Sequence, residues 1–142
     1  MATYIIQIED TFDVPREKVF ALFSDHVRFG NLLGAPVKRI KDSDEADPNG
    51  LGSVRKIGIG PIALEETVTG FEPDSLIEYT ITSLSPIRHH QGRIRFSETL
   101  AGQTEIHYTI SFEEVIPFTG ALIHSALEKA LLRGMKRVPK LA

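Results

Sequence analysis

Cysteine is absent from this chain of 142 residues, which excludes disulfides, thiolate metal sites and a cysteine nucleophile. Positive charge is not in excess either. The formal net charge is -3, so the chain lacks the excess of positive charge that is typical of nucleic-acid-binding proteins. The GxSxG motif, the P-loop and the GxGxxG motif are also missing, so none of these signatures supports a nucleophilic or nucleotide-binding function.

Long hydrophobic runs are missing as well. The longest apolar run is far shorter than the about 20 residues that a transmembrane helix needs. Residues 1–11 lack the basic start and apolar core of a signal peptide. Residues 42–52 are the longest polar segment, but neither flank of it could bury a core alone. We therefore expect a soluble, cytoplasmic protein with one domain over residues 1–142.

The spacing of apolar residues predicts the order of the elements. Residues 3–12 alternate between apolar and polar side chains, which is typical of a half-buried strand. Residues 13–25 predict a helix with Asp13 as its N-cap and Pro15 in its first turn, and a second short helix ends at Gly34. From there the period is two, which predicts one strand beginning at Pro36 and further strands over 53–59, 62–71, 76–83, 88–99 and 104–115.

Residues 119–138 show helical spacing and predict one long helix. Its expected apolar stripe consists of Leu122, Ile123, Leu127, Leu131 and Val138. Ala126, Ala130 and Gly134 form a column of small residues, each four positions from the next. A helix in a dense core would carry bulky side chains there. The column therefore indicates either a close approach to the sheet or a space left open beside the helix.

The strands can be aligned because each has one apolar face, which a slip of one residue would turn outward. With Gly60-Pro61 as a hairpin tip, Ile59 lies opposite Ile62, Ile57 opposite Leu64, and Arg55 opposite Glu66. The next strand places Tyr79 in line with Val68 and Ile81 near Glu66, and the last two strands add inward residues to the same face. An otherwise apolar interior thus receives five polar side chains, namely Arg55, Glu66, Tyr79, His90 and Tyr108.

Two interpretations of these five residues stay open. Buried ionisable groups are costly unless they are paired, and Arg opposite Glu has bidentate geometry available. They could therefore form a structural ion pair that specifies register, with the tyrosine hydroxyls bound to the backbone. Alternatively, they form the polar end of a ligand cavity, bounded on the other side by the small residues of the last helix.

The remaining histidines give weaker signals. Neighbouring residues on a strand point to opposite faces, so only one of His89 and His90 can face the interior. No third ligand has metal-site spacing, and we expect neither a metal nor a cofactor. His26, at the junction of the two short helices, could line the mouth of a cavity, but an exposed histidine at a helix end is favoured. His107 and His124 are expected to face outward.

Several motifs in order resemble one protein family. VPREKVFALFSD, GSVRKI, FEPDSLIEYTI and TEIHYTISFEE are similar to the START/Bet v 1-like helix-grip superfamily, specifically the polyketide cyclase/dehydrase-like branch of SRPBCC proteins. The resemblance implies an α+β helix-grip fold, in which a curved seven-stranded antiparallel sheet wraps around the long C-terminal helix. Two short helices follow the first strand, and a hydrophobic cavity separates sheet and helix. Arg55 and Glu66 match positions that recur in this branch, whereas the gate and latch motifs of plant hormone receptors are absent.

Three functional hypotheses remain. The first is binding of a small hydrophobic molecule, lipid-like or polyketide-like, through Arg55, Glu66, Tyr79, His90, Tyr108, Ile57, Leu64, Ala126 and Ala130. The second is a polyketide cyclase/dehydratase-type enzyme in which Glu66 or His90 moves a proton while Arg55 or Tyr79 holds a carbonyl oxygen. His90 is the better candidate, because Glu66 is expected to be held by Arg55. The third is a regulatory or interaction domain with a vestigial cavity. The sequence specifies neither the identity of the ligand nor the oligomeric state, for which a homodimer is one alternative.

Overall fold

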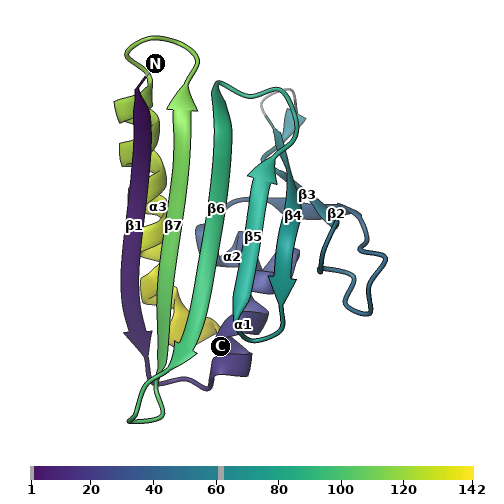
Figure 1. Ribbon diagram of the computed structural model, residues 1–142, viewed down its shortest axis with the longest axis vertical. Helices are drawn as coiled ribbons and strands as arrows, with labels where there is room; N and C mark the ends of the chain where they lie inside the picture. Colours follow the sequence, from purple (N-terminus) through teal and green to yellow (C-terminus); the bar gives the residue numbers. More distant parts are fainter. Residues whose placement is uncertain (1, 61–62) are drawn as a thin grey trace.

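The computed structural model describes residues 2–60 and 63–142, and it has the expected α+β helix-grip fold (Figure 1). In this part of the chain, seven strands form one antiparallel sheet in the order β1-β7-β6-β5-β4-β3-β2. The elements are β1 (Thr3–Phe12), α1 (Arg16–Ser24), α2 (His26–Leu33), β2 (Val37–Lys41), β3 (Val54–Ile57), β4 (Leu64–Glu72), β5 (Leu76–Ile81), β6 (Ile87–Glu98), β7 (Thr104–Glu114) and α3 (Gly120–Leu141).

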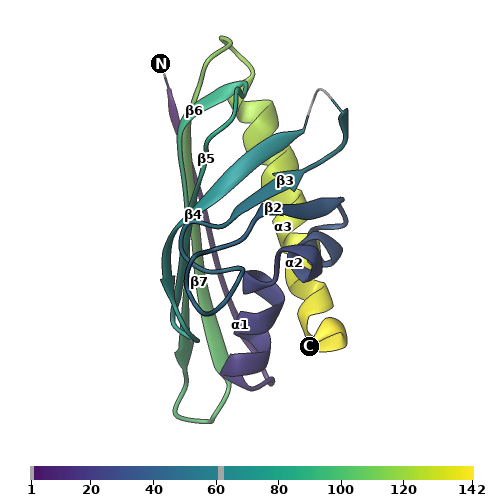
Figure 2. The same cartoon turned by 90° about the vertical axis from the view of Figure 1, so that its right-hand side faces the viewer.

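The three helices lie on the same side of the sheet (Figure 2). Strands β3 and β4 lean over toward α3, so the sheet curves around that helix, while α1 and α2 lie toward the C-terminal end of α3. This arrangement buries one face of each long strand and the facing side of the helices. Among the described residues, no helix combines the length and the apolar character that crossing a lipid bilayer requires.

Alternation along the strands builds the core as the sequence predicts. In β7 every second residue is buried, from Thr104 through Glu114. Aromatic rings fill the interior where α1 packs against the sheet. The ring centroid of Phe23 on α1 lies 5.7 to 6.3 Å from those of Phe29, Phe96 and Tyr108. This end of the molecule is therefore a dense core, whereas open space lies beside the N-terminal half of α3.

The predicted strand register is confirmed where the structure describes it. Arg55 pairs with Glu66, Ile57 with Leu64, Glu66 with Ile81, and Val68 with Tyr79. The predicted pairing of Ile59 with Ile62 lies outside the described residues. The register was predictable because each of these strands has one continuous apolar face.

Two predictions about the helix ends are wrong. Helix α1 begins at Arg16 after Pro15, and no side chain caps it, so Asp13 is not its N-cap. The cap found in this region belongs to α2 instead, where the Asp25 carboxylate accepts a hydrogen bond from the backbone N–H of Arg28 at 3.1 Å. Helix α3 also continues past Val138 to Leu141, with Pro139 in its last turn.

The small-residue column of α3 serves two different purposes. A Cβ atom at Gly134 would lie 3.1 Å from the carbonyl oxygen of Leu32, so this glycine allows α2 to approach α3 closely. Ala126, two turns earlier, lies beside open space. The expected apolar stripe also needs a correction, because Leu122 is 73 % exposed and does not face the sheet.

Candidate functional site

A cavity of about 410 Å³ lies between the sheet and the N-terminal half of α3. Its volume falls within the range of about 300–1,000 Å³ that is typical of small-molecule pockets. The apolar lining residues are Phe29, Leu33, Ile57, Leu64, Ile81, Ile87, Ile110, Ile123, Ala126, Leu127 and Leu131. Four polar side chains complete the lining, namely Glu66, Tyr79, His90 and Tyr108. The cavity is thus apolar, with polar groups contributed by β4, β5, β6 and β7.

Arg55 is paired with Glu66 behind this lining. The Nε atom of Arg55 donates a hydrogen bond of 2.9 Å to Oε1 of Glu66. Nη2 lies 2.8 Å from the same oxygen, at an angle that makes it an ion-pair contact without a second hydrogen bond. Both nitrogens approach one oxygen, so the fork-to-fork arrangement that is available to Arg and carboxylate is not formed.

Two aromatic rings enclose the Arg55 guanidinium. Its central carbon lies 4.3 Å from the ring centroid of Phe29 and 4.6 Å from that of Tyr79, at cation–π distance. Burial lowers the pKa of Arg55, but the Glu66 carboxylate and the tyrosines raise it by more, so the guanidinium stays charged. Arg55 is only 2 % exposed and is not among the cavity-lining residues.

Tyr79 and Tyr108 meet at the sheet side of the cavity, where their hydroxyls are hydrogen-bonded to each other. Gly92 makes room for the Tyr79 ring, because it pairs with Tyr79 across β5 and β6, and a Cβ atom there would lie 2.3 Å from the ring. Burial raises the pKa of both tyrosines. Both side chains are therefore neutral phenols at physiological pH.

His90 reaches the cavity through an irregularity in β6. The register with β7 shifts between Arg88 and Gln91, and His89 has a positive φ of 53°. The His89 side chain is 73 % exposed and pairs with Glu113 on the outer face, while His90 points inward. The expectation that one histidine of this pair faces the interior is thus correct. Among the described residues, no three His, Asp or Glu side chains gather as a metal site would require.

The protonation state of His90 follows from its surroundings. Its Nδ1 atom accepts a hydrogen bond of 3.2 Å from the backbone N–H of Ile81. Burial lowers the pKa of His90, and the nearby Arg55 lowers it further against the opposing effect of Glu66. The ring is therefore neutral near pH 7, and its single proton sits on Nε2 because Nδ1 acts as the acceptor.

The family can be assigned from this fold and from one sequence comparison. The family model described as "Polyketide cyclase / dehydrase and lipid transport" matches residues 5–141. The chain belongs to this family. No curated protein matches the chain in sequence.

Solved structures support the same fold at low sequence identity. A START superfamily protein from Mycobacterium smegmatis aligns with a TM-score of 0.78 at 11 % identity, covering 97 % of this chain and 99 % of that one. Ara h 8.0201 aligns with a TM-score of 0.72 at 13 % identity, over 99 % of this chain and 98 % of its own. Truncated norcoclaurine synthase from Thalictrum flavum aligns with a TM-score of 0.70 at 14 % identity, covering 96 % of this chain and 93 % of that one. These similarities show the helix-grip fold alone.

The structure brings most of the sequence-predicted site residues of this family member to one cavity. Its lining includes Glu66, Tyr79, His90, Tyr108, Ile57, Leu64 and Ala126. Arg55 lies behind Glu66, and Ala130 is not among the lining residues. The predicted set omitted the other apolar lining residues, which are Phe29, Leu33, Ile81, Ile87, Ile110, Ile123, Leu127 and Leu131. Phe29 and Leu33 of α2 had a usable signal, because residues four apart lie on the same side of a helix.

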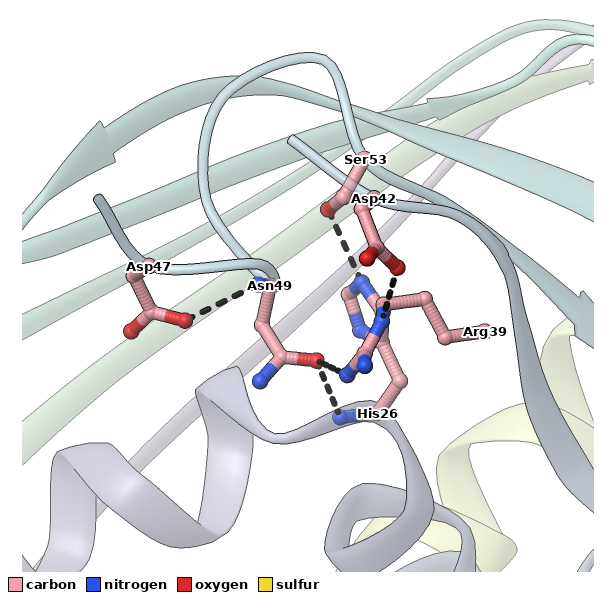
Figure 3. Close-up of polar contacts among 6 residues, drawn as sticks. All are labelled: His26, Arg39, Asp42, Asp47, Asn49 and Ser53. Carbon is pink, nitrogen blue, oxygen red and sulfur yellow. Dashed lines mark hydrogen bonds and ion pairs between the residues drawn. The ribbon is translucent and has the colours of Figure 1, made fainter. Parts of the chain in front are cut away.

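A second buried polar cluster lies outside the cavity, at the start of α2 (Figure 3). His26 is 1 % exposed, and its Nε2 lies 2.9 Å from Oγ of Ser53. The amide oxygen of Asn49 accepts hydrogen bonds from Nη1 of Arg39 at 2.9 Å and from the backbone N–H of His26 at 3.4 Å. The expectation of an exposed histidine at a helix end is thus wrong, and His26 does not line the cavity mouth either.

This cluster ties the polar loop between β2 and β3 to α2. Arg39 also donates to Asp42 at 2.8 Å, and Asp47 accepts from the backbone N–H of Asn49 at 2.9 Å. Burial, with help from the positive charges of Arg55 and Arg39, lowers the pKa of His26 to about 3. Within the described part of the chain, Nδ1 of His26 has no hydrogen-bond partner.

We expect Glu66→Leu to destabilise the protein by about 3–5 kcal/mol, because it leaves the buried Arg55 charge without a counter-ion. The double variant Arg55→Met with Glu66→Leu should recover a large part of that loss, since it removes both charges together. Urea unfolding of the three proteins measures these differences.

Glu78→Leu is the matched control for this pair. Glu78 on β5 also forms an ion pair with an arginine of the neighbouring strand, because its Oε2 lies 2.7 Å from Nη2 of Arg93 on β6. The Arg93 side chain, however, is 46 % exposed. Its loss should cost less than about 1 kcal/mol. A Glu66→Leu protein as stable as the control variant would show that the buried pair contributes little.

We expect the unfolding free energy to fall as the pH drops below about 6.5 toward 3, in part because of His26. In that window the unfolded chain binds a proton at this histidine and the folded chain does not, so acid favours unfolding. One such group gives a slope of at most about 1.4 kcal/mol per pH unit. The pH dependence of urea unfolding measures it.

His26→Gln should flatten this slope, because glutamine does not titrate. His124→Gln is the matched control, since His124 lies on α3 and contacts only the backbone oxygen of Ile5 among the described hydrogen bonds. A His26→Gln protein with the slope of the unsubstituted chain would contradict the assignment.

Proposed function

We propose that this protein binds a small, largely apolar molecule in the cavity between the sheet and α3. The observation that carries the proposal is an opening of about 410 Å³ whose lining is apolar except for four polar side chains on the sheet side. Pockets with this composition are typical of small-molecule binding, because apolar walls provide the free energy and a few polar groups orient the ligand. The family description, which includes lipid transport, supports the same proposal.

The proposed roles follow from position. Ile57, Leu64 and Ala126 would contact the apolar part of the ligand. Glu66, Tyr79, His90 and Tyr108 would contact its polar part, and Arg55 would act from behind by holding Glu66 and Tyr79 in place. Ala130 has no assigned contact in this proposal.

A cavity-filling substitution tests the proposal. We expect the purified protein to raise the fluorescence of the uncharged dye N-phenyl-1-naphthylamine, which reports apolar pockets; the chain has no tryptophan to interfere. Ala126→Leu adds three carbons to the cavity wall and should weaken dye binding at least about tenfold, because it takes up the space that the dye needs.

Ala121→Leu is the matched control, on the same helix at an exposed position that does not line the cavity. It should bind the dye as the unsubstituted chain does. Equal binding by the Ala126→Leu and Ala121→Leu proteins, or no dye binding by the unsubstituted chain, would overturn the proposal.

Catalysis in the same cavity is a second candidate function. The specific observation in its favour is His90, which lines the cavity and carries a proton on Nε2 with no described hydrogen-bond partner there. A neutral imidazole of this kind can donate a hydrogen bond to a bound carbonyl oxygen and stabilise the negative charge that develops on it. Glu66 is less suited, since Oε1 is engaged by Arg55. A cyclase or dehydratase acting on a polyketide-like substrate would fit this arrangement.

His90→Leu separates the two functions. If the protein is an enzyme of this kind, the variant should lose turnover of a polyketide-like substrate while still binding the dye, because leucine has no hydrogen-bond donor for the carbonyl oxygen. Turnover that is equal in both proteins would remove the catalytic role of His90.

A further inference from the structure

The polar end of the cavity has a definite set of free hydrogen-bonding groups. We infer that the ligand is an uncharged molecule with a carbonyl or hydroxyl oxygen at the end that lies against Tyr79, Tyr108 and His90, and that carboxylates of the same size are excluded. This inference rests on the proposed binding function and narrows the class of ligand.

Two donors face the ligand from the sheet. The two tyrosine hydroxyls carry two protons, and only one of these is used in the hydrogen bond between them. The other is free to be donated, and no further partner for it exists among the described residues. The second donor is Nε2–H of His90, because Nδ1 already accepts from Ile81. A ligand oxygen could accept from these groups, which line the cavity and have donor protons that no described residue accepts.

The cavity offers no positive charge to a ligand. Within the described part of the chain, its lining contains neither lysine nor arginine. Arg55 lies behind the lining, where its guanidinium is held by Oε1 of Glu66 and enclosed by the rings of Phe29 and Tyr79. With 2 % exposure it offers very little accessible surface to a ligand anion.

Glu66, the only charged lining residue in the described part of the chain, works against an anion. Glu66 keeps Oε1 on Arg55, and Oε2 receives no hydrogen bond from the described residues. A ligand carboxylate would be transferred from water to an apolar cavity beside this second carboxylate, and neither charge would gain a partner. A ligand hydroxyl, in contrast, can donate to Oε2 and accept from the tyrosine pair or His90.

A series of eight-carbon compounds tests this inference by competition with bound N-phenyl-1-naphthylamine at neutral pH. We expect 1-octanol and 2-octanone to displace the dye, and octanoate, which is ionised at this pH, to bind at least about a hundredfold more weakly than they do. The three probes share their chain length, so the comparison isolates the charge at the polar end.

Two single variants locate the polar end. Tyr79→Phe and Tyr108→Phe each remove one hydroxyl and should weaken 2-octanone binding by about three- to tenfold more than they weaken binding of the dye. Tyr4→Phe is the matched control, because the Tyr4 hydroxyl contacts Glu114 at 3.5 Å and Tyr4 does not line the cavity. Urea unfolding of each variant shows that it is folded.

The outcomes distinguish this inference from the proposed function. Octanoate binding as tightly as 1-octanol would overturn the inference and leave the binding function standing, since the dye would still be displaced from the cavity. Weakening by Tyr4→Phe equal to that of the two cavity variants would also overturn it. If the unsubstituted protein binds neither the dye nor any of the probes, the proposed function itself fails.

Discussion

The buried ion pair of Arg55 and Glu66 is the interaction on which the site depends. Arg55 comes from β3 and Glu66 from β4, and the enclosing rings belong to α2 and β5. One guanidinium therefore connects its own strand to three other elements, and it does so where water cannot compensate for a lost partner. A charge buried this way is tolerated only if it is paired. The pair therefore restricts these four elements to a narrow range of relative positions.

This arrangement also explains why an arginine inside the molecule does not make the cavity cationic. The charge of Arg55 is balanced by Glu66 and covered by Phe29 and Tyr79, so its influence on the cavity is indirect. It positions the Glu66 carboxylate and the Tyr79 ring, and it helps to keep the nearby histidines neutral. The polar end of the cavity is consequently a set of neutral donors beside one engaged carboxylate.

Much of the fold could be predicted from the sequence, because strand alternation leaves few choices. A slip of one residue between β3 and β4 would expose Ile57 and Leu64 and bury Lys56, so the register of Arg55 with Glu66 follows from pattern alone. The helix contacts were less predictable. Gly134 was compatible with open space or with close packing, and only the position of Leu32 in α2 shows that packing is the answer.

The errors have a common physical origin. Asp13 and Leu122 were assigned from local spacing, but the cap of α1 and the orientation of α3 depend on how each helix approaches its neighbours. His26 was expected to be exposed because helix ends usually are, whereas the loop that carries Asn49 and Ser53 folds back and buries it. Local patterns contain no information about such a loop.

By itself, the sequence determined the order of the strands along the chain, the inward face of each and five of the polar residues on that face. These properties depend on periodicity, which a chain carries in its local composition. The tertiary structure decided which of those polar groups a ligand can reach. Arg55 and Glu66 are equivalent in the pattern, yet only Glu66 lines the cavity. Accessibility is set by rings and helices that are distant in sequence, since Phe29 and Tyr79 cover one partner and leave the other uncovered.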